Sequence, residues 1–150
     1  MAEGTAPTPQ TVADAVGRGM LADDAASTEL GMRVVAMGPG YAKLSMRVLP
    51  RMLNGFKICH GGYITTLADS AFAFACNSYN ELTVAAGIVV DFLAPGRLDD
   101  ELTAEAHEVS LAGRTGVYDV TVRNQKGDLI AVLRGRSYRL KGRQTVPLAP

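Results

Sequence analysis

Asp69 is the residue of this sequence that could most readily take part in chemistry. It is the only acidic residue between Tyr63 and Asn77, a stretch built mostly of Ala, Phe, Leu and Ile. Burying a carboxylate costs free energy unless a partner or a reaction uses the charge. We therefore treat Asp69 as a candidate general base or nucleophile, with a solvated carboxylate at the edge of a helix as the alternative.

Two glycines, Gly61 and Gly62, come just before this stretch and follow His60. The first backbone N–H groups of a helix have no partner within the helix, and glycine lets a ligand approach them closely. Such groups can polarise a carbonyl oxygen or hold an oxyanion. The pattern predicts a carbonyl-binding site, although glycine pairs also form ordinary tight turns.

The element that must position these residues is a helix over Tyr63 to Asn77. Apolar residues recur there at spacings of three and four, which is typical of a buried helix, at Ile64, Leu67, Ala68, Ala71, Phe72 and Ala75. Its many alanines allow a sheet to pack closely against it. We expect this to be the long central helix of the domain.

Strand patterns occupy most of the remaining chain. A hairpin turning at Gly38-Pro39-Gly40 is expected from Leu30 to Leu49, and four further strands are expected over Thr83 to Leu93, Leu102 to Leu111, Gly116 to Asn124 and Leu129 to Leu140. Two strands, a helix and four strands do not alternate as a parallel α/β sheet does. The order predicts an α+β fold, an antiparallel sheet wrapped around the central helix.

One short helix is expected before the first strand, over Thr11 to Leu21, where apolar residues again have helical spacing. Residues 1–10 and 143–150 lack such periodicity, so we expect both to be disordered tails. The predicted domain therefore covers residues 11–142.

Composition excludes several classes of protein. The chain has 150 residues with 15 Lys+Arg and 15 Asp+Glu, so no net charge attracts it to nucleic acid. Its apolar stretches are too short to cross a membrane, and its first residues lack a signal-peptide pattern. Two cysteines indicate a reducing compartment, so we expect a cytoplasmic protein. With two histidines and no C-x-x-C pair, we expect no metal site.

Three ordered segments resemble one known family. His60-Gly61-Gly62 followed by Leu67-Ala68-Asp69 resembles the start of the central helix in hotdog-fold acyl-CoA thioesterases. Asp91 to Gly96 and Gly113 to Val120 resemble later strands of the phenylacetate-degradation, PaaI-type branch, so the resemblance spans Val34 to Leu140. It implies a hotdog fold and hydrolysis of acyl-CoA thioesters, with aromatic acyl groups such as phenylacetyl and no cofactor beyond the coenzyme A of the substrate.

The same resemblance implies roles for individual residues. Asp69 is the expected catalytic carboxylate, and the Gly61 N–H is expected to polarise the thioester carbonyl. Asn54 matches a position that hydrogen-bonds near the thioester. His60 is expected to organise this loop, and Gly62 to contribute to substrate binding.

The spacing of Gly61 and Asp69 also bears on oligomeric state. Eight residues of one helix separate them by about 12 Å along the axis, whereas a base and a carbonyl polariser acting on one thioester should converge within about 6 Å. One subunit therefore cannot supply both groups. We expect a homodimer in which two antiparallel helices share each site, and further assembly into a homotetramer.

A basic cluster near the end of the chain is a candidate site for the phosphates of coenzyme A. Arg114 and Thr115 lie in a Gly-Arg-Thr-Gly turn, and Arg134 and Arg136 lie in the last predicted strand. Arginine matches phosphate oxygens well, so we expect these residues to bind coenzyme A. The alternative is a charged edge strand that prevents aggregation.

Two other functions remain open. A non-catalytic acyl-CoA-binding module is favoured by one departure from the family: Val84-Ala85-Ala86-Gly87 stands where related enzymes often carry a water-holding Ser or Thr, with Thr83 just upstream. A hydratase or dehydratase of the same fold would need a histidine with a carboxylate. A Cys59 nucleophile activated by His60 is disfavoured, because sequence neighbours rarely point at one another.

Overall fold

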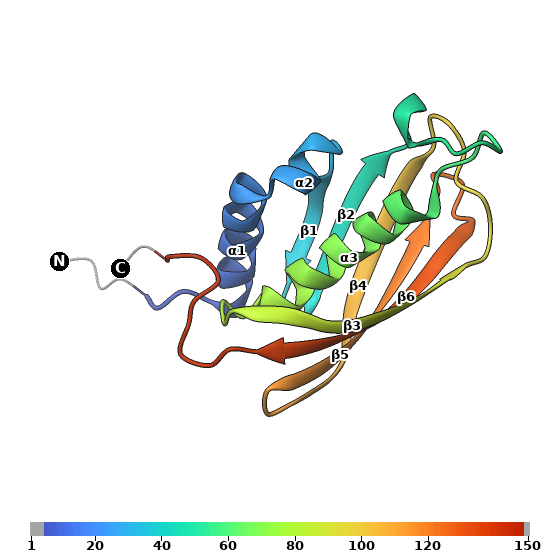
Figure 1. Ribbon diagram of the computed structural model, residues 1–150. Helices are drawn as coiled ribbons and strands as arrows, with labels where there is room; N and C mark the ends of the chain where they lie inside the picture. Colours follow the sequence, from blue (N-terminus) through green and yellow to red (C-terminus); the bar gives the residue numbers. More distant parts are fainter. Residues whose placement is uncertain (1–4, 149–150) are drawn as a thin grey trace.

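The structure, a computed structural model, describes residues 5–148. Its helices and strands in chain order are α1 (Pro9–Asp23), α2 (Ala25–Glu29), β1 (Arg33–Gly38), β2 (Tyr41–Arg47), the short 3-10 helix η1 (Pro50–Met52), α3 (Gly61–Asn77), β3 (Thr83–Phe92), β4 (Glu101–Ala112), β5 (Thr115–Arg123) and β6 (Leu129–Arg139). The six strands form one antiparallel sheet in the order β1-β2-β4-β5-β6-β3, with α3 lying across one face (Figure 1). The predicted α+β fold with one central helix is confirmed.

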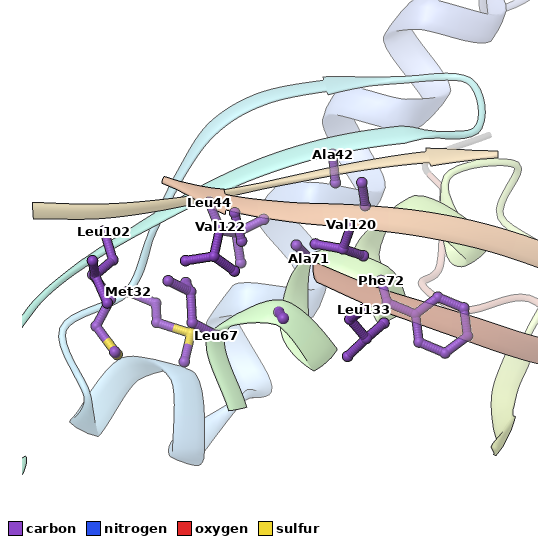
Figure 2. Packing of buried hydrophobic residues seen from close by; sticks show 14 of the residues in the cluster. Met32, Ala42, Leu44, Leu67, Ala71, Phe72, Leu102, Val120, Val122 and Leu133 are labelled. Atoms are coloured by element: carbon purple, nitrogen blue, oxygen red, sulfur yellow. The ribbon is translucent and has the colours of Figure 1, made fainter. Parts of the chain in front are cut away.

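Helix α3 is the centre of the hydrophobic core because it is buried along most of its length. Leu67, Ala71 and Phe72 of α3 point toward apolar residues of the strands in Figure 2, among them Leu44, Val120, Val122 and Leu133. Gly135 of β6 permits the closest approach, since a Cβ there would lie 2.7 Å from the Phe72 ring. The small residues of both elements thus set how tightly the sheet packs on α3.

The N-terminal region contains more helix than the sequence pattern predicts. Helix α1 begins at Pro9 rather than Thr11, with Thr8 as its N-cap, so residues 9 and 10 belong to the domain and not to a tail. A second helix, α2, begins directly after Asp24, whose Oδ1 accepts a hydrogen bond of 2.9 Å from Ser27 N. The sequence pattern predicts no second helix here, whereas the Asp24 carboxylate caps one.

The segment after Arg143 is also packed rather than free. Asn80 forms two hydrogen bonds with the backbone of Val146, at 3.0 and 2.9 Å, and Leu82 N donates to the Arg143 carbonyl at 2.9 Å. The expectation of a disordered tail from residue 143 is therefore wrong for these residues. Residues 1–4 and 149–150, which the same expectation covered, lie outside the described residues.

The length and polarity of the helices decide whether any of them could span a membrane. Among residues 5–148, the helices are too short or too polar to cross a bilayer. Helix α3, the most apolar of them, has 17 residues. It is used instead to fill the core beneath the sheet.

Candidate active site

The N-terminus of α3 presents one backbone N–H that is free for a ligand. His60 is the N-cap, and its Nδ1 accepts a hydrogen bond of 3.0 Å from Gly62 N. The next N–H group, that of Tyr63, donates to the His60 carbonyl at 3.0 Å. Within the part of the chain that the structure describes, Gly61 N has no hydrogen-bond acceptor. Of the two glycines singled out in the sequence, Gly61 is thus the one able to bind a carbonyl oxygen.

Asn54 organises the loop that leads into α3. Its Oδ1 accepts hydrogen bonds from Phe56 N at 2.9 Å and Ile58 N at 3.4 Å, and its backbone N donates to the Ile58 carbonyl at 2.8 Å. The Asn54 Nδ2 group makes no hydrogen bond to any described residue. The side chain therefore shapes the loop with its oxygen and keeps a donor for a ligand.

The loop and the segment after β3 enclose a cleft of about 530 Å³. Two backbone hydrogen bonds fix the loop, from Cys59 N to the Gly96 carbonyl at 2.7 Å and from His60 N to the Met52 carbonyl at 2.8 Å. The cleft is lined by Asn54, Ile58, Cys59, Gly61, Ile64, Phe92, Leu93, Ala94, Pro95 and Gly96. A mostly apolar cleft with a few polar donors is typical of small-molecule sites.

Asp69 lies away from this cleft, two turns further along α3. It is half-buried, has no hydrogen bond or ion pair with the described residues, and burial raises its pKa above the ordinary carboxyl value. It does not line the cleft, as expected from its axial distance of about 12 Å from Gly61. One protomer therefore brings together Asn54, His60, Gly61 and Gly62 but not Asp69.

The structure disfavours a thiol nucleophile at Cys59. Burial, reinforced by the charge of Asp100, raises the pKa of Cys59 to about 11, so the thiol is protonated at neutral pH. His60 Nδ1 is engaged with Gly62 N. Within residues 5–148, no three His, Cys, Asp or Glu side chains are grouped so that they could hold a metal ion.

Arg134 and Arg136 of β6 lie on the face of the sheet opposite α3. Gly135 faces the Phe72 ring, so its neighbours Arg134 and Arg136 point the other way and are exposed. Arg134 forms a two-pronged ion pair with Asp119, at 2.7 and 2.9 Å. Its guanidinium thus already has an anionic partner, and neither arginine lines the cleft.

Arg114 and Thr115 lie at the far end of the sheet from the cleft. Thr115 pairs with Tyr138 of β6, whereas Phe92 at the cleft pairs with Ala131. Seven residues of an extended strand separate the two positions by about 23 Å. A role of Arg114, Thr115, Arg134 and Arg136 in binding coenzyme A stays a prediction, and one protomer alone does not place them at the cleft.

Sequence reasoning missed the role of Phe92 beside Gly61. A Cβ on Gly61 would lie 2.8 Å from Phe92 Cζ, so the tip of the ring rests against the start of α3. The two residues come from different elements, and no periodicity connects them. The segment from Asp91 to Gly96 was noted only as part of a family resemblance, which gave no indication of this contact.

Comparison with known proteins shows which family the chain belongs to. The model of the Thioesterase superfamily matches residues 56–131. Acyl-coenzyme A thioesterase PaaI of Escherichia coli is 43% identical over 123 residues, covering 82% of this chain and 88% of that protein. The structure of E. coli PaaI, from the phenylacetic acid degradation operon, superposes with a TM-score of 0.89 at 40% identity, covering 91% of this chain and 99% of that chain.

A Streptococcus mutans protein bound to acetyl CoA has the same fold but is less similar to this chain in sequence and in structure. Its TM-score is 0.72 at 27% identity, and the match covers 75% of this chain and 91% of that one. Both the sequence match and the arrangement of a six-stranded sheet around α3 are those of the hotdog fold. The chain therefore belongs to the thioesterase superfamily and is of the PaaI type.

Proposed function

We propose that this protein hydrolyses acyl-CoA thioesters, preferring aromatic acyl groups such as phenylacetyl, at sites shared between the two protomers of a homodimer. The free Gly61 N–H at the start of α3 is the observation that carries the proposal. A thioester carbonyl bound there would meet a positive helix end, which stabilises the oxyanion formed when the carbonyl is attacked. The Asn54 Nδ2 donor lies in the same cleft and could bind the substrate beside it.

Asp69 of the partner protomer would act as the general base. Burial raises the pKa of this carboxyl, which makes it a better proton acceptor for water than an ordinary aspartate. It takes a proton from water as the water oxygen attacks the thioester carbon, and the thiolate of coenzyme A then leaves. The mechanism requires no metal or further cofactor.

The dimer is supported by β3, which forms one edge of the sheet. Its apolar side chains are unusually exposed for a monomer, with Val89 at 67%, Phe92 at 53% and the following Leu93 at 56%. An exposed apolar edge strand invites pairing with another chain. Pairing of two β3 strands about a twofold axis would bring Gly61 of one protomer toward Asp69 of the other.

We also propose a higher assembly, a role for the basic cluster and a cellular compartment. Association of two such dimers would give a homotetramer. Arg114, Thr115, Arg134 and Arg136 would reach the phosphates of coenzyme A bound at a neighbouring protomer's cleft. Both cysteines are free and buried, which suits a reducing compartment such as the cytoplasm.

A hydratase or dehydratase is less well supported by the geometry. Such an enzyme needs a histidine free to exchange protons with the substrate. His60 Nδ1 instead accepts the Gly62 N–H and caps α3. The other histidine, His107, lies exposed in β4 and bonds Glu105 at 2.9 Å.

The test is release of free thiol from a panel of aromatic and aliphatic acyl-CoA esters by the protein and by Asp69→Asn. We expect hydrolysis of aromatic esters by the wild type and a loss of about 10²- to 10⁴-fold in the folded variant. Asp23→Asn, an exposed aspartate in α1, serves as the matched control. Binding of acyl-CoA without hydrolysis by the wild type would replace the enzyme with the binding-module alternative.

Isotope incorporation separates a general base from a nucleophile at Asp69. Direct attack by water labels the acid product in heavy-oxygen water during a single turnover. Attack by the carboxylate, followed by opening of the anhydride at the Asp69 carboxyl, leaves the first product unlabelled. We expect a labelled product.

A further inference from the structure

We infer that Phe92 is a specificity-determining residue, whose ring forms the wall of the acyl subsite and favours flat aromatic acyl groups. The inference rests on the proposed function and assigns its substrate preference to one side chain. Phe92 is the only aromatic residue among those that line the cleft. The others are aliphatic, small or polar.

The position of the ring is defined by Gly61. A Cβ on Gly61 would lie 2.8 Å from Phe92 Cζ and 3.2 Å from both Cε atoms, so the ring points tip-first at the Gly61 backbone. A carbonyl oxygen accepting the Gly61 N–H would lie about 2.9 Å from that nitrogen. The thioester carbonyl would therefore lie next to the Phe92 ring, and we place its acyl group against that ring, in the mostly apolar cleft.

The strand register explains why the ring lies on the side of the cleft. Phe92 is the last residue of β3 and pairs with buried Ala131, so its side chain is on the face that carries α3. On that face the ring lies beside Gly61 and lines the cleft. Ile64 and Ile58 complete an apolar surface next to it.

An aromatic acyl group gains more binding free energy from contact with the Phe92 ring than a saturated acyl group does. Two aromatic rings in an offset or edge-to-face arrangement stabilise one another beyond the burial of their surface. A saturated ring of similar size gains the burial alone. The expected preference is roughly three- to tenfold in favour of the aromatic ring.

The experiment compares phenylacetyl-CoA with cyclohexylacetyl-CoA, which differ in aromaticity and little in size, for wild type and Phe92→Leu. We expect the ratio of kcat/KM for the two esters to fall three- to tenfold in Phe92→Leu. Phe56→Leu is the matched control, because Phe56 lies in the neighbouring loop, is 86% exposed and does not line the cleft. Its ratio should equal that of the wild type.

Binding measurements test the acyl subsite independently of whether the protein hydrolyses thioesters. Dissociation constants are measured for ketone analogues of both esters, in which a methylene between sulfur and carbonyl prevents hydrolysis. A protein that hydrolyses no ester but shows the Phe92-dependent binding ratio would refute the enzyme and retain the acyl subsite. An unchanged ratio in folded Phe92→Leu, or an equal change in Phe56→Leu, would overturn the inference.

Discussion

At the scale of single residues, Asp69 shows a conflict between stability and function. Its carboxylate is half-buried in an apolar helix and has no hydrogen bond or ion pair with the described residues. Asp119 presents the opposite case, because two hydrogen bonds from Arg134 lower its pKa. A residue kept without a partner at the expense of stability is a candidate for a functional role.

This conflict predicts how stability depends on pH. The folded-state pKa of Asp69 lies above the ordinary carboxyl value of 3.8, so between these two values the folded protein binds more protons than the unfolded chain. The stability contribution of protonated Asp69 is complete below 3.8 and is lost as pH rises through the folded pKa. We therefore expect Asp69→Asn to raise Tm at pH 7, with a gain that shrinks toward pH 4.

The control for this experiment is Asp119→Asn, for which the expected change in Tm at pH 7 has the opposite sign. The lowered pKa of Asp119 stabilises the folded protein above 3.8, and this contribution is lost as pH falls through the folded pKa. Asp119→Asn should lower Tm slightly at pH 7, since the pair with Arg134 is exposed to solvent. Thermal melts between pH 4 and pH 7 measure both effects, and a lower Tm for Asp69→Asn at pH 7 would contradict the argument.

At the scale of elements, the start of α3 combines a cap with a free donor. His60 satisfies the N–H of Gly62 and leaves that of Gly61 open. The backbone of His60, with φ −60° and ψ 133°, is of the kind that a following proline accepts. Position 61 is also the first helical residue, where proline is well tolerated.

Gly61→Pro should therefore remove the donor and leave the helix in place. We expect turnover to fall about 10²- to 10³-fold, the effect of deleting one oxyanion donor, with little change in the urea midpoint. Gly61→Ala is the matched control, because it adds the same Cβ against Phe92 and retains the N–H. Equal losses in both variants would show that contact with Phe92, and not the N–H, is what turnover depends on.

At the scale of the whole molecule, the two halves of the proposed site lie in different places on one protomer. The cleft at the N-terminus of α3 contains Gly61 and Asn54, whereas Asp69 lies outside it. The free edge of β3 exposes the apolar surface through which a second protomer could complete the site. The proposed mechanism therefore requires the assembled dimer.

Mixing two inactive variants tests the shared site. In a mixed dimer of Gly61→Pro and Asp69→Asn, one site retains Gly61 from one chain and Asp69 from the other, and the second site loses both. Random reassembly of equal amounts should restore about one quarter of wild-type sites. Thiol release is measured after co-refolding, with dimers isolated by size exclusion, and activity no higher than that of the separate variants would place the whole site within one protomer.

The sequence by itself determined the central helix and the strands, because their signals are local, whereas α2 was not predicted. The three- and four-residue spacing of apolar residues predicted α3 to its last residue, but placed its start at Tyr63, two residues after Gly61 where the helix begins. It also identified Asn54, Gly61 and Asp69 as candidates, and the separation of Gly61 from Asp69 followed from helix geometry alone. Each of these inferences depends only on residues close together in the chain.

The tertiary structure decided the contacts between distant residues, which depend on strand register and packing. Only the fold places Phe92 against Gly61, pairs Arg134 with Asp119, and holds Val146 on the Asn80 amide. Sequence periodicity does not reveal these contacts, because the two partners lie in elements that are far apart in the sequence. The free backbone donor at the N-terminus of α3 was therefore predictable, whereas the residue that lies against it was not.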